Sequence, residues 1–345
     1  MVGLSDVART VGVSESTASR ALNRPELVRS EVVERVREAA ERLGYVPNPF
    51  ARSLRIQGSK TLGLIIPDST NPFFAEVAKG IEDACFRAGY TLILGNSDRS
   101  LEKEAAQAQV FYEQRVDGVL LFNTNDASAE TMQRLLDRSL PVVLVERRSP
   151  GPSVDAVLSD NRAAIRAAIE HLVDLGRRRI AFLVGDVTAS HYAERLSAYQ
   201  EMLGDLGLTS DRELVRTDVV SYEEGQVAAE TLARLARPPT ALLCATDTLA
   251  IGALRGLATM GLKVPQDVAV IGYGDTEISA YTTPSLTSVG QQKHLVGATA
   301  VEIMLRRLTA RRGEALPPQS RVIPTTLVIR ESTAGPGGAE EHAHD

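Results

Sequence analysis

From residue 61 onward, short apolar runs alternate with amphipathic helical stretches, and this alternation constrains the fold more than any other feature. Apolar runs without alternating polar positions are typical of strands buried on both faces of a parallel sheet, with helices covering the two faces. The expected strands form two series, one at 62–66, 90–94, 118–122 and 142–145 and one at 180–184, 241–244 and 268–271. We therefore predict a two-lobed α/β core with a doubly wound parallel sheet in each lobe.

Polar side chains follow most of these runs at the point where the expected strand ends. Open parallel sheets bind ligands outside the carboxyl ends of their strands, so these residues are candidate ligand contacts, although each alone could be an ordinary loop residue. Carboxylates and amides pair with hydroxyl groups, and aromatic rings stack on the C–H face of a sugar. The candidates are Asp68, Asn71, Phe73, Phe74, Asn96, Glu146, Arg195, Asp247, Asp275 and Gln291.

The N-terminal part of the chain has a helical pattern of its own. Residues 4–11 carry an apolar stripe, Gly12 interrupts it, and Ser14 can cap a second helix. Ser30 can cap a third helix over 31–43. Two short helices at a tight glycine turn, the second with small polar groups and an arginine outward, describe an all-α helix-turn-helix headpiece. The residues expected to contact DNA are Ser14, Glu15, Ser16, Thr17, Ser19, Arg20 and Asn23.

Individual roles can be predicted for some of these side chains. Arg20 can form a bidentate contact with guanine or clamp a phosphate, and Thr17, Ser19 and Asn23 suit phosphates. For Glu15 two interpretations are open. Its carboxylate can complement the positive end of the helix dipole, or it can accept a hydrogen bond from a cytosine amino group.

The charge distribution fits a small DNA-binding module on a larger acidic body. Residues 1–60 hold 10 Lys and Arg against 7 Asp and Glu, a balance of +3, whereas the remainder holds 28 against 37, a balance of −9. No 18-residue apolar span and no signal-peptide core within residues 1–25 are present. We expect a cytoplasmic protein without a membrane partner.

The segment after the third expected helix is a candidate hinge. Pro47 and Pro49 favour an extended approach, Asn48 can cap, and residues 50–56 could form two helical turns. A helix this short is marginal by itself and needs a partner to form. The alternative is a plain linker.

Several stretches resemble the LacI/GalR family of bacterial transcriptional repressors. They are GVSESTASRALN at 12–23, LGYVPNPFARSL at 43–54, NPFFAEVAKGIED at 71–83, RVDGVLLF at 115–122 and VPQDVAVIGYGD at 264–275. The resemblance spans about residues 3–331. It implies a core like that of periplasmic sugar-binding proteins, with two lobes, three crossovers, a ligand in the cleft and dimerisation through the core.

The resemblance also implies how the hinge works. Paired hinge helices of a homodimer enter the minor groove of a palindromic operator duplex. There Leu54 wedges between the central bases, with Ala51 one turn before it, Arg55 beside it and Asn48 at the start. An apolar wedge unstacks a base step and kinks the duplex. Cleft closure would then control whether the hinge helices pair. The expected assembly is a homodimer, with a tetramer as the alternative.

The ligand implied by the resemblance is a small effector, for which a monosaccharide or sugar acid is our expectation. Pentoses, hexoses, gluconate-type acids and purine-like effectors all occur in the family. The chain departs from the family pattern at Gly274, where Asp is frequent, and at Glu146, where Asp is more usual. Whether the effector induces or co-represses is open, because this depends on the state that it prefers.

Catalytic residues, cofactors and metals are not expected. The sequence lacks GxGxxG after a strand, GxxxxGK[ST] and GxSxG, and its histidines lack the spacing of metal ligands. Two alternatives are a solute-binding protein for uptake and a cytoplasmic sugar-binding or sugar-converting protein with an N-terminal regulatory module. The expected domains are a headpiece at 1–46, a hinge at 47–60, a core at 61–334 and a disordered tail at 335–345. Within the core we expect an N-lobe of about 61–160 with 291–320 and a C-lobe of about 161–290 with 321–334.

Overall fold

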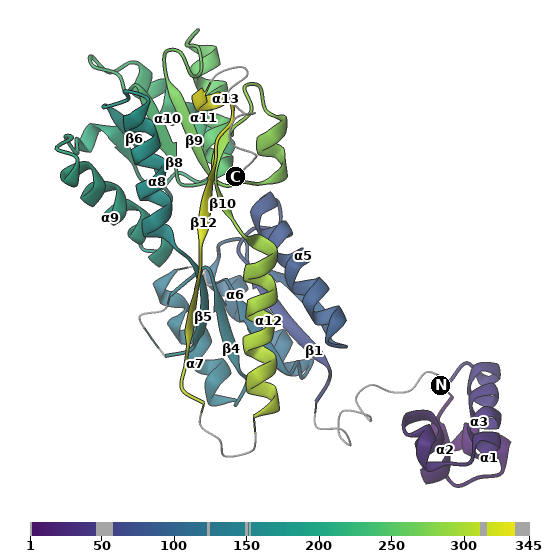
Figure 1. The fold of residues 1–345 in the computed structure, drawn as a ribbon. Helices are drawn as coiled ribbons and strands as arrows, with labels where there is room; N and C mark the ends of the chain where they lie inside the picture. The colour runs from purple at the N-terminus through teal and green to yellow at the C-terminus, as the bar shows by residue number, and fades with distance from the viewer. Residues whose placement is uncertain are drawn as a thin grey trace. The chain divides into compact units, whose positions relative to one another are not determined.

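The computed structural model describes residues 2–45, 58–122, 125–148, 151, 153–310 and 316–334, and Figure 1 shows the course of the chain. It divides into two units, residues 1–59 and residues 60–345, each with its own hydrophobic core. The expected helical headpiece and two-lobed α/β core are therefore confirmed. The expected hinge contacts Asn48, Ala51, Leu54 and Arg55 and the expected tail lie outside the described residues.

The headpiece contains the three expected helices, α1 (Leu4–Val11), α2 (Glu15–Asn23) and α3 (Ser30–Leu43). Gly12 ends α1 in the left-handed region with φ 75°, which suits a residue without a Cβ. Ser14 caps α2 as predicted, since its Oγ accepts a hydrogen bond of 3.1 Å from the Thr17 amide. The prediction for Ser30 was wrong, because Ser30 is already helical and Arg29 occupies the cap position without a side-chain hydrogen bond.

The headpiece core is small and is built from short aliphatic side chains. Val7, Ala18 and Val36, one from each helix, are fully buried at its centre. Arg35 of α3 donates a 2.7 Å hydrogen bond to the carbonyl oxygen of Val11, which ties α3 to the end of α1. This contact satisfies one of the carbonyl groups that every helix end leaves unpaired.

The N-lobe holds a six-stranded, wholly parallel sheet of order β11-β5-β4-β3-β1-β2. One face packs on α5 and α12, and the other on α6 and α7. The strands are β1 (Thr61–Ile66), β2 (Thr91–Asn96), β3 (Gly118–Leu121), β4 (Val142–Val145), β5 (Asp155–Ser159) and β11 (Ser320–Ile323). The helices are α5 (Pro72–Arg87), α6 (Leu101–Glu113), α7 (Ala129–Asp137) and α12 (Lys293–Thr309).

The C-lobe repeats this architecture with the strand order β12-β10-β9-β8-β6-β7, parallel except for β12, which runs antiparallel to β10. One face packs on α8 and α9 and the other on α10 and α11. The strands are β6 (Ile180–Leu183), β7 (Val215–Arg216), β8 (Ala241–Cys244), β9 (Ala269–Gly274), β10 (Thr287–Gln291) and β12 (Thr325–Val328). The helices are α8 (Asn161–Asp174), α9 (Ser190–Asp205), α10 (Tyr222–Ala233), α11 (Asp247–Thr259) and a short α13 (Glu331–Ala334).

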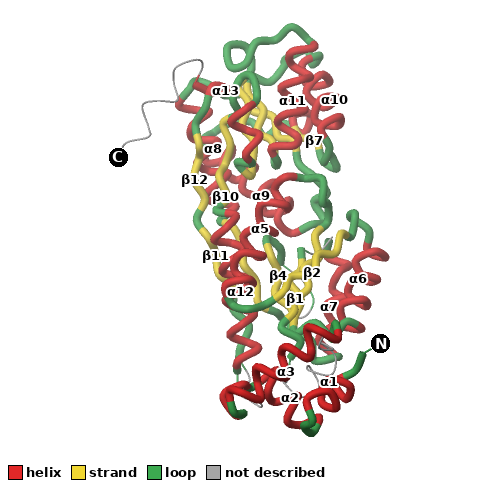
Figure 2. Tube along the Cα trace, turned by 90° about the vertical axis from the view of Figure 1, so that its right-hand side faces the viewer, coloured by secondary structure: helices red, strands yellow, loops and turns green. Residues whose placement is uncertain are grey.

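The chain passes between the lobes three times, after β5, after β10 and between β11 and β12 (Figure 1). The third crossing lies at Pro324, so residues 321–323 belong to the N-lobe sheet and not to the C-lobe as expected. Figure 2 shows the two lobes stacked end to end, with β10, β11 and β12 running along one side. In the part of the chain that the structure describes, no helix combines the length and apolarity needed to cross a membrane.

Helices α10 and α11 approach each other so closely that a residue larger than glycine would clash at their contact. A Cβ added at Gly252 would lie 2.0 Å from the carbonyl oxygen of Tyr222, and one at Gly225 would lie 2.5 Å from the carbonyl oxygen of Leu249. Both obstacles are backbone atoms, which cannot rotate away as a side chain can. The outer face of the C-lobe sheet is therefore covered by a helix pair that depends on glycine at the contact.

We expect Gly252→Ala to destabilise the C-lobe, because α10 and α11 must separate to admit the methyl group. Overpacking of this kind costs about 1–3 kcal/mol, so the thermal midpoint should fall by several degrees. Gly204→Ala in α9 is the matched control, since a Cβ there meets nothing within 4 Å and alanine favours helix. Its midpoint should be unchanged or slightly higher. Equal midpoints for the two variants in a differential scanning experiment would contradict this account.

Candidate functional site

The outward face of α2 presents the polar groups that the sequence predicts for a DNA-binding helix. Glu15, Ser16 and Arg20 are exposed, as are Ser14 and Asn23. The Ser14 hydroxyl lies 2.9 Å from that of Ser16 and 2.8 Å from that of Thr17, which is half-buried. This hydroxyl cluster lies at the N-terminus of α2, where backbone amides and the helix dipole favour anions.

Ser19 is less accessible than the other predicted DNA contacts of the headpiece, and its contact with a phosphate stays a prediction. Its exposed fraction is only 9%, and its carbonyl oxygen accepts a 2.8 Å hydrogen bond from the Asn23 side chain. Ser19 follows Ala18 on the helix and shares a side with Leu22, three residues later, so it lies at the edge of the inward face. The remaining outward residues still form one surface.

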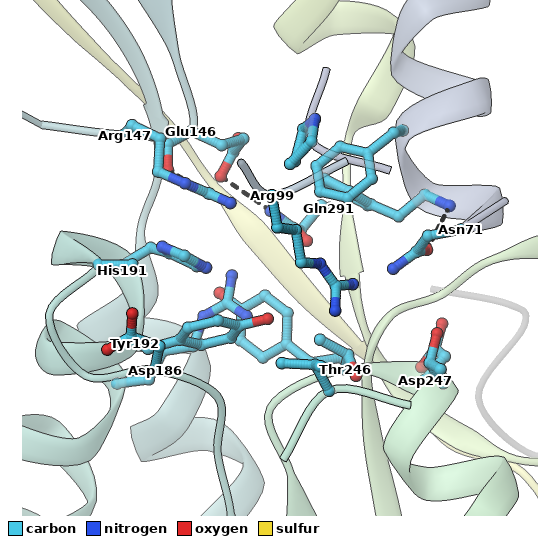
Figure 3. Close-up of a pocket in the computed structure, with 18 of the residues that line it drawn as sticks. Asn71, Arg99, Glu146, Arg147, Asp186, His191, Tyr192, Thr246, Asp247 and Gln291 are labelled. Carbon is cyan, nitrogen blue, oxygen red and sulfur yellow. Dashed lines mark hydrogen bonds between the residues drawn. The ribbon is translucent and has the colours of Figure 1, made fainter. Parts of the chain in front are cut away.

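The core contains a cavity of about 160 Å³ where the carboxyl ends of both sheets meet (Figure 3). This is smaller than the about 300–1,000 Å³ typical of pockets for drug-sized ligands, so the cavity suits a small molecule. Both lobes contribute to its lining. Seven of the ten predicted ligand contacts are among the lining residues: Asn71, Phe73, Phe74, Glu146, Arg195, Asp247 and Gln291.

Asp68 and Asn96 follow β1 and β2 as predicted but are absent from the cavity lining, because they hold the neighbouring loops. One carboxylate oxygen of Asp68 accepts hydrogen bonds from the Thr70 amide and hydroxyl, and the other pairs with Arg99 at 3.0 Å. The Asn96 side chain accepts a hydrogen bond from the Ser69 amide. These two residues therefore shape the cleft without lining it.

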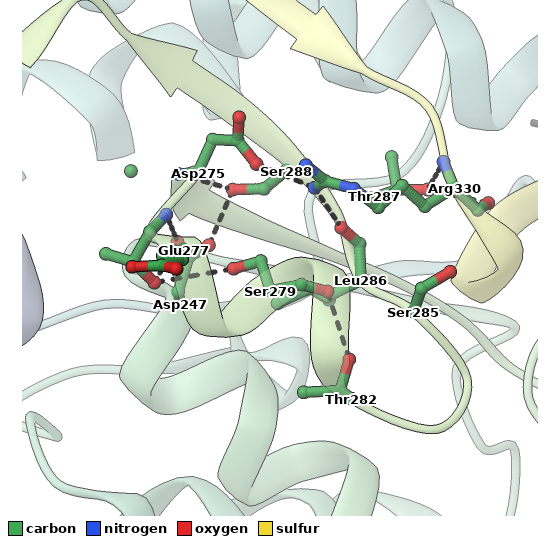
Figure 4. Close-up of polar contacts among 12 residues, drawn as sticks. Asp247, Asp275, Glu277, Ser279, Thr282, Ser285, Leu286, Thr287, Ser288 and Arg330 are labelled. Carbon is green, nitrogen blue, oxygen red and sulfur yellow. Dashed lines mark hydrogen bonds and ion pairs between the residues drawn. The ribbon is translucent and has the colours of Figure 1, made fainter.

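Asp275 is the third predicted contact that does not line the cavity. Gly274 before it has φ 126° and Asp275 itself has φ 46°, so the chain turns sharply at the end of β9. The carboxylate of Asp275 pairs with Arg330 at 2.6 Å, as Figure 4 shows. This chain has Gly274 where the family frequently has Asp, and the aspartate that follows it, Asp275, is directed away from the cavity.

The lining also includes residues that were not among the ten predicted contacts. Arg147, Asn125 and Asp186 lie within four residues after the ends of β4, β3 and β6, so the rule of strand ends extends to them. His191 and Tyr192 begin α9 one turn before Arg195, and helical spacing from Arg195 is the signal that could have found them. The additional lining residues are Pro67, Arg99, Asn125, Arg147, Asp186, Ala189, His191, Tyr192, Val220, Thr246, Thr248, Tyr273 and Thr276.

Glu146 is buried at the junction of the lobes and is fully hydrogen-bonded. Its carboxylate accepts a 2.8 Å hydrogen bond from the Ser159 hydroxyl and a 2.9 Å hydrogen bond from the Gln291 side chain. Burial raises the pKa of Glu146, whereas the hydrogen bond from Ser159 and the charge of Arg195 act in the opposite direction. Through these hydrogen bonds the Glu146 carboxylate connects the ends of β4, β5 and β10.

Arg195 is held in place by contacts on several sides. Its Nε donates a 2.8 Å hydrogen bond to Asn161, and a terminal nitrogen donates a 2.7 Å hydrogen bond to the carbonyl oxygen of Ala245. The guanidinium lies 3.5 Å from the centre of the Tyr273 ring, whose hydroxyl also donates to Asn161. The position of this cation is therefore set by the protein before a ligand binds.

Asp247 begins α11 and is almost completely buried. Its carboxylate accepts hydrogen bonds from the Ser288 hydroxyl at 2.5 Å and from the Thr276 amide and hydroxyl at 2.7 and 3.0 Å (Figure 4). Burial raises the pKa of Asp247, and these hydrogen bonds oppose the rise. The carboxylate thus joins the start of α11 to the chain after β9.

Taken as a set, the lining combines fixed acceptors, fixed donors and aromatic rings. Glu146 and Asp247 present carboxylates, Arg195 presents a guanidinium, and Phe73 presents an aromatic ring. Among the described residues, no group of three or more His, Cys, Asp or Glu side chains could hold a metal ion. The arrangement can bind a small molecule that both donates and accepts hydrogen bonds.

Replacing Asp247 with alanine should destabilise the C-lobe, because the Thr276 amide and two buried hydroxyls would lose their acceptor. Unsatisfied buried donors cost about 1–3 kcal/mol, and we expect a clear fall in the thermal midpoint. Asp186→Ala is the matched control, since Asp186 lines the same cavity but is only half-buried and bonds only to nearby Thr188. If both variants melted alike, the bracing role of Asp247 would be wrong.

Comparisons with known proteins agree with this architecture. Residues 3–48 match the model of "Bacterial regulatory proteins, lacI family", and residues 169–333 match that of a periplasmic binding protein-like domain. The transcriptional repressor PurR of Vibrio atlanticus is 34% identical over 89% of this chain and 92% of its own. PurR of Aliivibrio salmonicida is 32% identical over 91% of this chain and 94% of its own.

Solved structures give the same result. The Lac repressor dimer bound to operator and an anti-inducer is 27% identical, with a TM-score of 0.85 over 96% of this chain and 99% of that chain. The regulator CelR in complex with cellobiose is 31% identical, with a TM-score of 0.73 over 96% and 100%. The headpiece, the two-lobed core and these similarities together show that the chain belongs to the lacI family of DNA-binding bacterial transcriptional regulators.

Proposed function

We propose that this protein is a cytoplasmic repressor that binds a palindromic operator as a homodimer and responds to a small effector in its cleft. The observation that carries the proposal is the combination of two parts in one chain. A helix with an exposed polar face, α2, accompanies a core whose cavity takes side chains from both lobes. A ligand that contacts both lobes can favour one arrangement of the lobes over another.

Exposed apolar side chains on the core support the homodimer. Strand β2 is an edge strand, and its Ile93 and Leu94 are 37% and 51% exposed. In the C-lobe, Tyr222 and Val227 of α10 are likewise exposed. Figure 2 shows β2 and α10 toward the same side of the core. A second copy that covers this side would bury the unpaired strand edge and bring two headpieces to one operator.

The link between cleft and DNA is proposed to be the hinge. Paired hinge helices with Leu54 as the wedge would add minor-groove contacts to those of two small headpieces. When the lobes of the two copies change their separation, the hinge helices can no longer pair and operator affinity falls. A coupling of this type is typically worth about 1–3 kcal/mol.

A monosaccharide-like effector fits the cleft lining. The carboxylates of Glu146 and Asp247 and the amide of Gln291 are acceptors and donors suited to hydroxyl groups, and the Phe73 ring suits a sugar C–H face. The solved regulator CelR binds cellobiose, which supports a carbohydrate. The PurR relatives make purine bases the competing class, and the experiment must include them.

Electrophoretic mobility shift on DNA upstream of the gene tests the proposal. We expect a sharp shift, protection of an inverted repeat, and a free protein that sediments at twice the 37.1 kDa chain mass. A panel of sugars, sugar acids and purine bases should include at least one compound that changes operator affinity about tenfold, as the coupling energy implies. Absence of a shift under every condition would refute the repressor, and turnover of a compound would favour an enzyme.

We expect Glu15→Ala to relax specificity at one symmetric base pair of each half-site, because its carboxylate would accept from a cytosine amino group. A good base contact contributes about 1–3 kcal/mol, so discrimination at that position should fall about tenfold or more. Glu41→Ala, an exposed glutamate of α3, is the matched control and should keep full discrimination. Uniformly changed binding to all operator variants would instead support the helix-dipole role of Glu15.

A further inference from the structure

In the part of the chain that the structure describes, two buried side chains of the cleft each carry one nitrogen without a hydrogen-bond partner. Arg147 follows β4 in the N-lobe and is 7% exposed, and His191 begins α9 in the C-lobe and is 5% exposed. Within the described residues, Arg147 Nε and His191 Nδ1 have no hydrogen-bond partner. Figure 3 shows both side chains reaching into the cavity from the same side.

Among the described residues, no neighbouring group forms a hydrogen bond with either of these two nitrogens. The Glu146 carboxylate is occupied by Ser159 and Gln291, and Arg147 reaches only the Glu146 carbonyl oxygen, at 2.9 Å. No ion pair of Arg147 is present among the described residues. The Glu146 carboxylate acts on Arg147 but also on Arg195, so two buried cations share one carboxylate, and a bound group that brings negative charge would be favoured here.

The two side chains differ in charge. Burial lowers the pKa of Arg147 to about 10, so the guanidinium remains a cation at neutral pH. Burial and the charges of Arg147 and Arg195 lower the pKa of His191 well below its usual value, so the imidazole is neutral. Arg147 therefore supplies a positive charge, and neutral His191 supplies one N–H donor, at Nδ1 in the tautomer that carries the proton there.

We propose that the effector carries an oxyanion, a carboxylate or a phosphate, which binds between Arg147 and His191 and bridges the lobes. An oxyanion accepts from both orphaned nitrogens and compensates the charge of Arg147. A hydroxyl could satisfy one nitrogen but would leave two arginines, Arg147 and Arg195, beside the single carboxylate of Glu146. The remaining hydroxyls of the ligand face Glu146, Asp247 and Gln291. The inference rests on the proposed function and narrows the effector to an acidic sugar or sugar phosphate.

Sugars with and without an acidic group test this inference on the full-length protein, and the two sugar phosphates remain cyclic, as their neutral counterparts are. The panel is glucose, gluconate and glucose 6-phosphate, then ribose, ribonate and ribose 5-phosphate, with hypoxanthine and guanine as the purine arm. Thermal shift selects binders, and isothermal titration calorimetry measures affinity. We expect an acidic member to bind about 10- to 100-fold more tightly than its neutral counterpart, and the acid or phosphate arm identifies the oxyanion.

Substitutions locate the preference. Arg147→Gln should abolish it, and Arg147→Lys, which keeps the charge but loses Nε, should retain part of it. His191→Gln should weaken acid binding less than Arg147→Gln does. Arg148→Gln is the matched control, because the adjacent Arg148 is exposed and the charge change is identical. An unchanged thermal midpoint without ligand shows that each variant is folded.

The outcomes separate this inference from the function on which it rests. Tighter binding of neutral sugars or purines, an acid preference that survives Arg147→Gln, or binding of no acid in the panel would each overturn the inference. All three are compatible with a repressor that binds its operator. Loss of operator binding in the unmodified protein would instead overturn the proposed function.

Discussion

The carboxylate of Glu146 is the interaction on which the cleft depends most directly. It lies at the end of β4 and accepts hydrogen bonds from Ser159 on β5 and from Gln291 at the end of β10. Gln291 belongs to the C-lobe sheet, whereas Glu146 and Ser159 belong to the N-lobe sheet. A hydrogen bond to a charged group typically contributes about 1.5–3 kcal/mol, so these contacts hold the two sheet ends in one arrangement at a crossing between the lobes.

The rest of the cleft follows the same principle, with polar groups that the protein itself positions. Arg195 is braced by Asn161, Ala245 and Tyr273, and Asp247 is braced by Ser288 and Thr276. Such preorganisation lowers the entropy lost when a ligand binds. Against this background the orphaned nitrogens of Arg147 and His191 are the exception. The other polar groups of the cleft already have hydrogen-bond partners within the protein, whereas these two nitrogens do not. This difference is the physical basis for selecting an acidic ligand.

In a regulator of the lacI family, binding in this cleft matters because it can change the affinity of the distant headpiece for DNA. An effector changes operator affinity only as far as it binds one arrangement of the lobes more tightly than another. Contacts that bridge the lobes are the ones that change between arrangements. Arg147 and His191 belong to different lobes, so the affinity for a ligand held by both would depend directly on the separation of the lobes. Contacts confined to one lobe would add affinity for the effector but would not change the affinity for the operator.

The sequence by itself determined the helix-turn-helix, the two series of strands and most of the cleft. Helical spacing and capping at Gly12 and Ser14 are local, so they do not depend on the rest of the chain. The buried strands are apolar runs, and the strand-end rule found Glu146, Asp247 and Gln291 because parallel strands bring their carboxyl ends together. By contrast, β5, β7, β10, β11 and β12 were not predicted, since polar residues interrupt the apolar run in each of them.

Only the tertiary structure decided which polar side chains face the ligand and which support the scaffold. Asp275 turns away because the backbone after Gly274 directs its carboxylate to Arg330, which is distant in the sequence. Ser19 is buried because the other headpiece helices cover the edge of α2. Arg147 and His191 line the same cavity only because the start of α9 lies across the cleft from the end of β4. These are contacts between segments far apart in sequence, and no local pattern encodes them.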